Sequence, residues 1–504
     1  MNWKVIGRSL KQADMRKRIF AVLGILLVFR ILAHLPVPIA DPQTIQQVLS
    51  NALNGSNSPQ FLNVLNVFSG GALEQFSIMV VGLGAYINAS IIMQLLTKAL
   101  PKLEAMHKEG EYGQKKINQY TRILTFPLAI IQAIGAVYLI RQIAQGIGGV
   151  GDITADATIW QWGLRVAAIT GGSMLLMWLG ELVTEQSLGN GISLLITVGI
   201  VSSLPKTVAQ IGSSVFDKTN GMTVFGHKLP INGKSLLVAL GILLAVIIVT
   251  WLVVKLNEAA RKVTVNYAKR VQGNRAYGGV TTILPIKLIT AGVVPIIFAV
   301  AFLSVPTFAG QLFANAANPT LQHIALNLTT WFQPPSSAAA FVAGGWHSYV
   351  YPVAYFLLVF VFTYFYTSIT FNSKEIAENL QKQGGFIEGV RSGNQTEKYL
   401  GKTVNRLTFF GALSLGLLAL LPIVAQMFFT NSRIAIGGTS VLILVSVALQ
   451  TLRAVESRAL MVTYDQYTRS DFFYEPETAV EAAGGGVRLK FLRRFKLGSK
   501  SDDK

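Results

Sequence analysis

Long apolar stretches separated by short polar segments dominate the pattern of this chain. Each stretch runs for about twenty residues, the length that an α-helix needs to cross a hydrocarbon core about 30 Å thick. About ten of them stand out, near residues 18–36, 75–99, 119–141, 158–180, 190–212, 235–256, 286–308, 350–371, 404–428 and 437–460. The pattern predicts an all-α integral membrane protein with about ten transmembrane helices.

The apolar region 61–97 is too long for one span and is interrupted by Ser69, Gly70 and Gly71. It predicts a short helix followed by a full span. The short helix, over residues 61–68, covers about 12 Å at about 1.5 Å per residue, so it cannot cross the membrane. Irregular backbone at this depth is stable only against protein or a water-filled cavity. Two interpretations stay open: a plug in an internal funnel, or a re-entrant or interfacial helix of a transporter.

The basic residues between the stretches indicate the topology. Lys and Arg gather in alternate loops, at residues 102–116, 257–287 and 372–406, whereas the opposite loops are poor in charge and residues 311–348 carry none. Cytoplasmic loops of membrane proteins are enriched in Lys and Arg, so the pattern places both termini in the cytoplasm.

The spans also suggest how the chain is divided. We expect a cytoplasmic N-terminus at 1–17, an N-terminal half at 18–215 with spans 1–5 and the short helix at 61–71, a C-terminal half at 216–462 with spans 6–10 and the basic loops 257–287 and 372–406, and a cytoplasmic tail at 463–504. The first apolar run is longer than that of a typical signal peptide, so we expect it to be retained. Two oppositely oriented halves would form an inverted repeat with the functional path between them.

Composition narrows the class further. Of 504 residues, 51% are hydrophobic and 13% charged, and the mean hydropathy is +0.48, which excludes ordinary soluble domains. The net charge of +19 would suit nucleic-acid binding, but its position in loops is explained more simply by topology. The absence of cysteine excludes disulfides, thiolate metal sites and a cysteine nucleophile.

Arg30 lies inside the first span. An unpaired charge at the bilayer centre costs about 2.5–3.5 kcal/mol on insertion scales, so this side chain must reach the interface or find a partner. Pro36 and Pro38 follow shortly after, which favours an interfacial anchor over an ion relay.

No enzymatic site emerges from the motifs. Residues 146–151 satisfy G-x-G-x-x-G, but they follow a span into an external loop instead of joining a strand to a helix, so we reject a dinucleotide site. No P-loop motif occurs, and the five histidines are scattered. Glu181 and Glu185, one turn apart, could pair as catalytic carboxylates, but solvated helix-end charges are favoured. We predict a non-enzymatic protein without metal or cofactor.

The basic loop 257–287 interleaves Lys and Arg with Tyr267 and Tyr277. Such a loop could bind RNA phosphates or an acidic protein surface, or could merely fix the topology. Topology needs only a few charges near span ends, so the length of the loop favours a docking site.

Several different short motifs follow one another along nearly the whole chain. They are FSGGAL at 68–73, INASIIMQLLT at 87–97, WLGE at 178–181, LGNGIS at 188–193, NYAKR at 266–270, LPIK at 284–287, GGF at 384–386 and GGTS at 437–440. Together they resemble the SecY family, the channel subunits of the bacterial Sec translocase.

The resemblance implies a fold and a function. The fold would be a clamshell of two inverted five-helix halves, hinged between spans five and six and opening sideways where spans two and three meet spans seven and eight. The protein would conduct unfolded secretory polypeptides and release apolar segments laterally, as a multi-pass protein of the bacterial plasma membrane. Its partners would be the small subunits SecE and SecG, the SecA motor ATPase, the ribosome, signal-sequence-bearing polypeptides and membrane lipid.

The resemblance also implies site residues. An aliphatic pore ring would consist of Leu83, Ile87, Ile192, Ile196, Ile297 and Ile443. The plug and its hinge would consist of Leu62, Asn63, Val64, Leu65, Asn66, Val67, Phe68, Ser69, Gly70 and Gly71. The lateral gate would include Asn88, Gln132 and Ile289. Motor and ribosome docking would fall on Arg261, Lys262, Lys269, Arg270, Arg275, Arg391 and Lys398.

Spacing alone would make the ring ordinary helix-packing core, because apolar residues at i and i+4 are common in spans. A ring of this kind is a dewetted constriction that excludes ions yet seals around an extended chain. Two positions depart from the family pattern. Ala85 replaces a usual proline, which softens the expected kink in span two, and Ile289 replaces an asparagine and removes a polar partner from the gate.

A secondary transporter with inverted repeats is the rival class. Transporters need buried charged or ion-coordinating groups near the midplane, and the spans offer few apart from Arg30 and Arg165.

Overall fold

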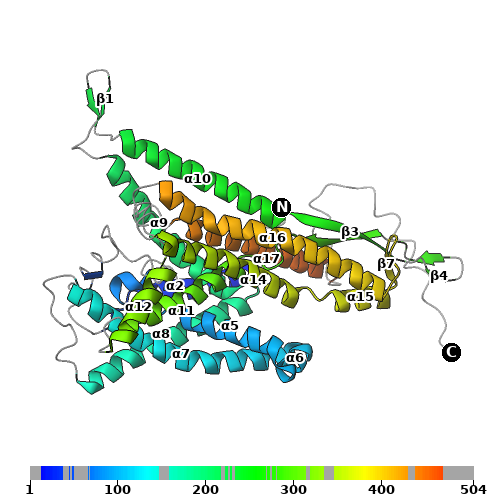
Figure 1. Ribbon diagram of the computed structural model, residues 1–504. Coiled ribbons are helices and arrows are strands. Elements are labelled where there is room, and N and C mark those ends of the chain that lie inside the picture. The colour runs from blue at the N-terminus through cyan, green and yellow to red at the C-terminus, as the bar shows by residue number, and fades with distance from the viewer. Residues whose placement is uncertain are drawn as a thin grey trace, which may run out of the picture.

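The computed structural model describes residues 13–37, 69–146, 158–216, 222–224, 227–229, 233–267, 270–272, 275–277, 279, 281–313, 318–333, 345–428 and 437–468, together with 45, 48, 49 and 66. Helices make up most of these residues and run side by side in a bundle (Figure 1). Among the predicted plug residues, 62–65, 67 and 68 lie outside the described residues.

Within the described residues, a long helix stands at each of the ten predicted spans. These helices are α2 (Ala13–Leu32), α5 (Gly84–Ala99), α7 (Glu111–Gly146), α8 (Ile159–Glu185), α9 (Gly191–Val215), α10 (Gly233–Glu258), α11 (Val294–Phe313), α14 (Val350–Thr370), α16 (Asn394–Phe428) and α17 (Gly437–Thr468). By length and composition, seven of the described helical segments can cross a membrane, and α11 contributes a shorter apolar helix. The predicted all-α membrane architecture is confirmed.

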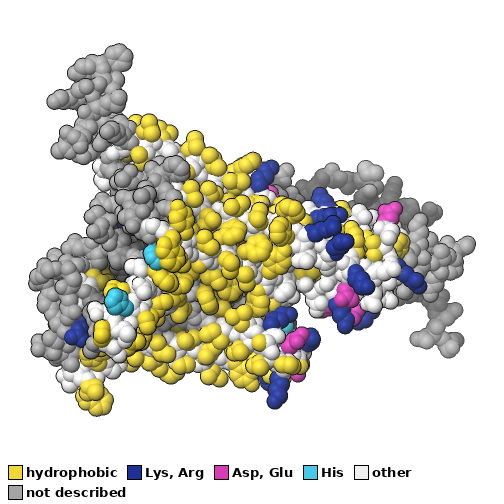
Figure 2. Space-filling model, viewed as in Figure 1, with side chains coloured by type: hydrophobic (Ala, Val, Ile, Leu, Met, Phe, Trp, Pro, Cys, Tyr) yellow, Lys and Arg dark blue, Asp and Glu magenta, His cyan; other side chains and the backbone are white. Residues whose placement is uncertain are grey.

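The outer surface of the bundle suits lipid. Apolar side chains point outward along its length, as on α10, where Leu237 is 75% and Trp251 is 60% exposed. In Figure 2 these side chains form a broad yellow band, and Lys and Arg gather beyond one end of it. That end carries α6 (Pro101–Lys108) and α15 (Ser373–Lys382), as Figure 1 shows. The separation follows the charge pattern of the loops.

The predicted start of the second span was wrong. The helix α5 begins at Gly84 instead of residue 75 and has 16 residues, about 24 Å at the usual rise per residue. Before it come a short 3-10 helix, η1 (Ala72–Gln75), and a series of turns.

Tertiary contacts satisfy the backbone of this irregular segment. The Val37 amide donates to the Phe76 carbonyl at 3.0 Å, and the Ile78 amide donates to the Leu35 carbonyl at 3.0 Å. The buried Ser173 hydroxyl donates to the Gly82 carbonyl at 3.1 Å. Protein groups therefore replace the hydrogen bonds that a continuous helix would have made within itself.

The seventh span also starts later than predicted. The residues 286 and 287 belong to strand β6 (Thr281–Lys287), and α11 begins at Val294. In β6, Ile286 and Lys287 pair with Arg261 and Ala260 of β3 (Ala260–Tyr267). Pairing with that strand competes successfully with helix formation at this position.

A three-stranded antiparallel sheet joins the two basic loops, which the sequence did not predict. Its strand order is β6, β3 and β7 (Gly385–Ile387). Val263 and Val265 alternate inward and pack with Ile286, Ile387 and Leu400 in a small separate core. Two short hairpins are formed by β1 (Met222–Val224) with β2 (His227–Leu229) and by β4 (Arg270–Gln272) with β5 (Arg275–Tyr277).

The long helices pack mainly with neighbours from their own part of the chain. In the first part α2 contacts α8 and α9, α5 contacts α7, and α8 contacts both α7 and α9. In the second part α10 contacts α17, α14 contacts α11 and α16, and α12 (Pro319–Phe332) lies against α11. Contacts between the two parts connect α5 and α7 with α11, and α9 with α10 and α17.

Candidate pore, gate and docking surfaces

The six predicted ring residues meet in one buried cluster. Leu83, Ile87, Ile196, Ile297 and Ile443 are each 1–5% exposed within it, and the half-buried Ile192 packs against it. These residues come from the segment leading into α5 and from α5, α9, α11 and α17, so both parts of the chain contribute. The side chains are all aliphatic, and a constriction that they line offers water no hydrogen-bond partner.

The start of α9 is fixed by a cap. The Asn190 side chain accepts hydrogen bonds from the Ile192 amide at 3.0 Å and the Ser193 amide at 3.4 Å. Close packing adds to this, because a Cβ at Gly191 would clash with the Gly180 carbonyl. The LGNGIS motif thus sets where Ile192 and Ile196 enter the cluster.

Gly70 and Gly71 both adopt left-handed backbone conformations, with φ of 68° and 87°. Such values favour glycine, which explains the residue type at both positions. The buried Ser69 hydroxyl donates to the Asn66 carbonyl at 3.1 Å and accepts from the Leu73 amide at 3.3 Å.

Arg30 does not act only as an interfacial anchor, the role that its position in the sequence favoured. Its Nη1 donates to the Gly70 carbonyl at 2.8 Å. The charge is therefore partnered by the backbone carbonyl of Gly70, which the sequence alone did not indicate.

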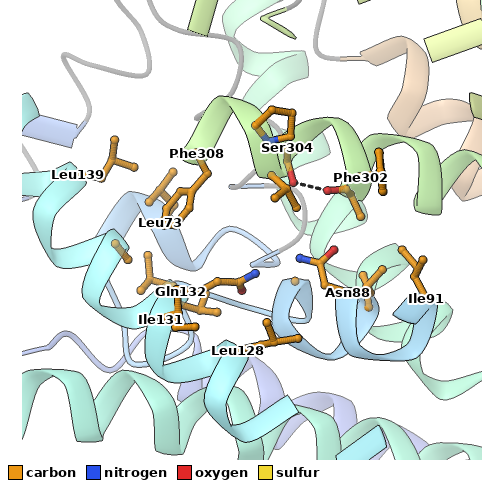
Figure 3. A pocket seen from close by; sticks show the side chains of 18 of the residues that line it. Leu73, Asn88, Ile91, Leu128, Ile131, Gln132, Leu139, Phe302, Ser304 and Phe308 are labelled. Carbon is orange, nitrogen blue, oxygen red and sulfur yellow. Dashed lines mark hydrogen bonds between the residues drawn. The ribbon is translucent and has the colours of Figure 1, made fainter. Parts of the chain in front are cut away.

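Asn88 and Gln132 line one cavity of about 380 Å³ between α5, α7 and α11 (Figure 3). Its walls are otherwise mostly apolar, with Phe302 and Phe308 on the α11 side. The Ser304 hydroxyl is turned to its own helix and donates to the Ala301 carbonyl at 2.7 Å. Ile289 is not among the residues that line this cavity. It is buried in the central cluster with the ring residues.

Helices α7 and α11 touch where a glycine faces an aromatic ring. A Cβ at Gly135 would overlap the Phe308 ring, so a larger residue at this position requires the ring to move. The close approach lies beside the cavity, at the seam where the resemblance implies a lateral gate.

Replacing this glycine is expected to loosen the seam. In Gly135→Ala the added methyl group must displace the Phe308 ring and so disturb the packing of α7 on α11, and overpacking of this kind costs about 1–3 kcal/mol. We expect precursors with weakened signal sequences to be exported about 5-fold to 150-fold more efficiently, because a free-energy change of about 1–3 kcal/mol corresponds to a factor of this size. Gly163→Ala on α8 is the matched control, because its Cβ meets nothing within 4 Å. Equal export by the two variants would contradict a gate at this contact.

The predicted docking residues whose side chains the structure describes lie at the polar end of the bundle. Arg261 and Lys262 are exposed on β3, and Arg391 and Lys398 are exposed on the second loop. Arg270 and Arg275 belong to the β4–β5 hairpin, whose side chains lie outside the described residues, as does Lys269 altogether. The sheet places β3 of the first loop next to β7 of the second, so the two loops form one surface.

The tip of the second loop is shaped by glycines. Gly384, Gly389 and Gly393 have φ of 71°, 77° and 95°, and a Cβ at Gly389 would meet nothing within 4 Å. The Thr396 hydroxyl donates to the Arg391 carbonyl at 3.0 Å, which ties the tip to the start of α16. The Arg391 side chain is therefore exposed on a turn whose backbone is bonded to α16.

Glu181 does not pair with Glu185 as a catalytic carboxylate would. It forms a two-point ion pair with Arg122 of α7, with contacts of 2.8 Å and 2.7 Å. The pair holds α7 against α8. Within the described residues, no group of three or more His, Asp or Glu side chains could hold a metal ion.

Comparison with known proteins identifies the family. A family model for SecY matches residues 77–452. The protein translocase subunit SecY of Streptomyces coelicolor is 37% identical over 466 residues, covering 92% of this chain and 99% of the relative. That of Corynebacterium glutamicum is 38% identical over 464 residues, covering 91% and 98%.

Solved structures support the same fold. A protein-conducting channel has a TM-score of 0.57 at 17% identity, covering 88% of this chain and 94% of that chain. Sec61 in the canine ribosome-channel complex has a TM-score of 0.54 at 17% identity, with the same coverage. Since the family model spans most of the chain and relatives above 30% identity match it almost end to end, the chain belongs to the SecY family of protein-conducting translocase subunits, which are non-enzymatic pores.

Proposed function

We propose that unfolded secretory polypeptides cross the membrane through the cluster formed by Leu83, Ile87, Ile192, Ile196, Ile297 and Ile443. The observation that carries this proposal is that helices from both parts of the chain bring these aliphatic side chains into one buried group. Flexible aliphatic side chains can seal around an extended chain without recognising its sequence.

Apolar segments leave this path sideways between α5 and α7 on one side and α11 on the other. The apolar cavity beside Asn88 and Gln132 lies at this seam. The described helices pack mainly against helices of their own part, within residues 18–215 or within 216–462. Few helix pairs connect the two parts, which supports two halves that can separate. Ile289 belongs to the buried central cluster and does not line this cavity, so we assign only Asn88 and Gln132 to the gate.

Residues 62–68 serve as a displaceable plug with its hinge at Gly70 and Gly71. Their deletion is expected to leave the protein assembled but leakier to ions and more permissive toward defective signal sequences, because the ring alone would then seal the resting channel. Ion flux from reconstituted vesicles measures the leak. A deletion that abolishes assembly would instead make this segment part of the structural core.

The basic end of the molecule faces the cytoplasm, where both termini lie, and the protein resides in the bacterial plasma membrane. The charge separation in Figure 2 supports this orientation. Arg261, Lys262, Arg391 and Lys398 then form a docking surface for the SecA motor or the ribosome, to which Lys269, Arg270 and Arg275 also contribute. SecE and SecG are the small membrane subunits that complete the complex.

Reconstituted vesicles separate this function from that of an ion-coupled transporter. A channel is expected to import or export a precursor protein only when the motor ATPase is added, independent of any solute. Solute uptake that follows an ion gradient, with no precursor movement in the presence of the motor, would favour the transporter. Buried ion-coordinating groups of that class are few in the described spans, where Arg30 is bonded to backbone.

A further inference from the structure

The segment that follows the proposed plug, residues 69–75, is held from two sides. We call it the hinge segment. On one side lies α2, which contributes the buried Phe29 and Arg30. On the other lies α9, where a Cβ at Gly199 would clash with the Gly70 Cα. The hinge segment is therefore wedged between the first and fifth spans.

The strongest polar contact in this wedge is made by Arg30. Its guanidinium donates to the Gly70 carbonyl at 2.8 Å, in a partly buried setting near the end of α2. A hydrogen bond from an ionised donor is about twice as strong as one between neutral groups, and low local polarity strengthens it further. The bond can persist only while the Gly70 carbonyl stays next to α2.

A second contact holds the other end of the hinge segment. Lys206 of α9 forms an ion pair with Glu74 at 2.8 Å. The other Glu74 oxygen accepts from the Asn66 side chain at 3.5 Å. Both Lys206 and Glu74 are partly exposed, so this pair is weaker than the Arg30 contact.

We infer that Arg30 and the Glu74–Lys206 pair form a latch that holds the hinge segment in its resting position and sets how strong a signal sequence must be to open the channel. The inference rests on the proposed function, since it assumes that the hinge segment moves when the channel opens. Each contact would have to break as the hinge segment leaves α2 and α9. A ligand shifts an equilibrium only by its preference for one state, so a weaker latch lets a weaker signal sequence open the channel.

The test is export of a precursor with a weakened signal sequence by the reconstituted translocase. Arg30→Met keeps an apolar stem but removes the donor, and we expect about a tenfold gain, the change that loss of one charge-assisted bond gives. A precursor with an intact signal sequence should move at the wild-type rate. Arg30→Lys retains a charged donor and should retain most of the selectivity. Arg16→Met, at an exposed position of the same helix, is the control and should change nothing.

The ion pair provides a test that does not depend on Arg30. Glu74→Lys and Lys206→Glu should each relax selectivity, and the double exchange should restore it toward wild type because the pair re-forms with reversed charges. This rescue distinguishes a latch from general loss of packing. If Arg30→Met reduces the amount of folded protein too far to assay, the charge exchange decides the question.

The outcomes separate the latch from the proposed function. Ile87→Asn with Ile196→Asn, which opens the ring itself, serves as the reference for a leaky channel. If that variant leaks while the Arg30 and Glu74 variants keep wild-type selectivity per folded molecule, the latch is wrong and the pore assignment stands. If the ring variant also shows no ion leak, the assignment of the ring to the pore is wrong.

Discussion

A channel in which Ile87 and Ile196 are both replaced by asparagine is expected to conduct ions at rest. Both side chains are at most 3% exposed and belong to the cluster that we assign to the pore. Leaving an amide without a partner in an apolar site costs about 1–3 kcal/mol, a cost that water removes by entering. The ring then stays wet, and export should become less selective, because the barrier that a signal sequence helps to open is already lowered.

Single-channel current in planar bilayers, compared at equal amounts of folded protein, measures this effect. Leu415→Asn, in the same buried cluster but outside the assigned ring, provides a matched control for a polar side chain in the core. The control should lower stability without raising the current. A well-folded ring variant that stays electrically silent even with residues 62–68 deleted would remove Ile87 and Ile196 from the pore.

Arg391→Glu is expected to reduce motor-driven export about tenfold or more while leaving folding intact. The residue is exposed on a turn between left-handed glycines, and surface changes of this kind usually cost within about 0.5 kcal/mol of stability. We expect the motor to bind more weakly, because a reversed charge repels an acidic docking surface that the wild-type residue attracts.

Export should be measured with a purified motor at several ionic strengths. Lys374→Glu, an exposed reversal on α15, is the matched control and should have a smaller effect. If Arg391→Glu accumulates normally and exports precursor at the wild-type rate, the tip has no docking role.

Hydrophobic pattern was enough to predict the ten long helices, because lipid requires about twenty apolar residues for each span regardless of the neighbours. It was not enough for the starts of α5 and α11. Residues 76–83 are as apolar as a helix but adopt turns, because Ser173 and the strand-like residues 35–37 satisfy their backbone groups. Partners distant in sequence supply those hydrogen bonds, so the local periodicity of apolar residues does not indicate them.

The cytoplasmic sheet was missed for the same reason. Strand β3 pairs with β7, more than a hundred residues later in the chain. Val263 and Val265 alternate with polar residues in the sequence, but the basic residues just before them, Arg261 and Lys262, were interpreted only as part of a docking loop. Alternation of apolar and polar residues over this stretch is typical of a strand.

For the candidate site, spacing alone predicted ordinary packing at the ring positions, and only the motif resemblance singled them out. The structure adds that the six side chains share one cluster, that Asn88 and Gln132 share one cavity, and that Ile289 lies elsewhere. The partner of Arg30 could not be predicted, because its acceptor is a backbone carbonyl that has no signature in the sequence.

A translocating polypeptide is expected to pass through the aliphatic ring. Because the chain contains no cysteine, one introduced thiol can report contact with a precursor that carries a single cysteine and is arrested during export. When an oxidant is added, we expect Ile196→Cys to form a disulfide with the arrested precursor, and we expect Leu243→Cys, on the outward face of α10, to form none. A precursor that is arrested across the membrane yet joins position 243 and not position 196 would contradict passage through the ring.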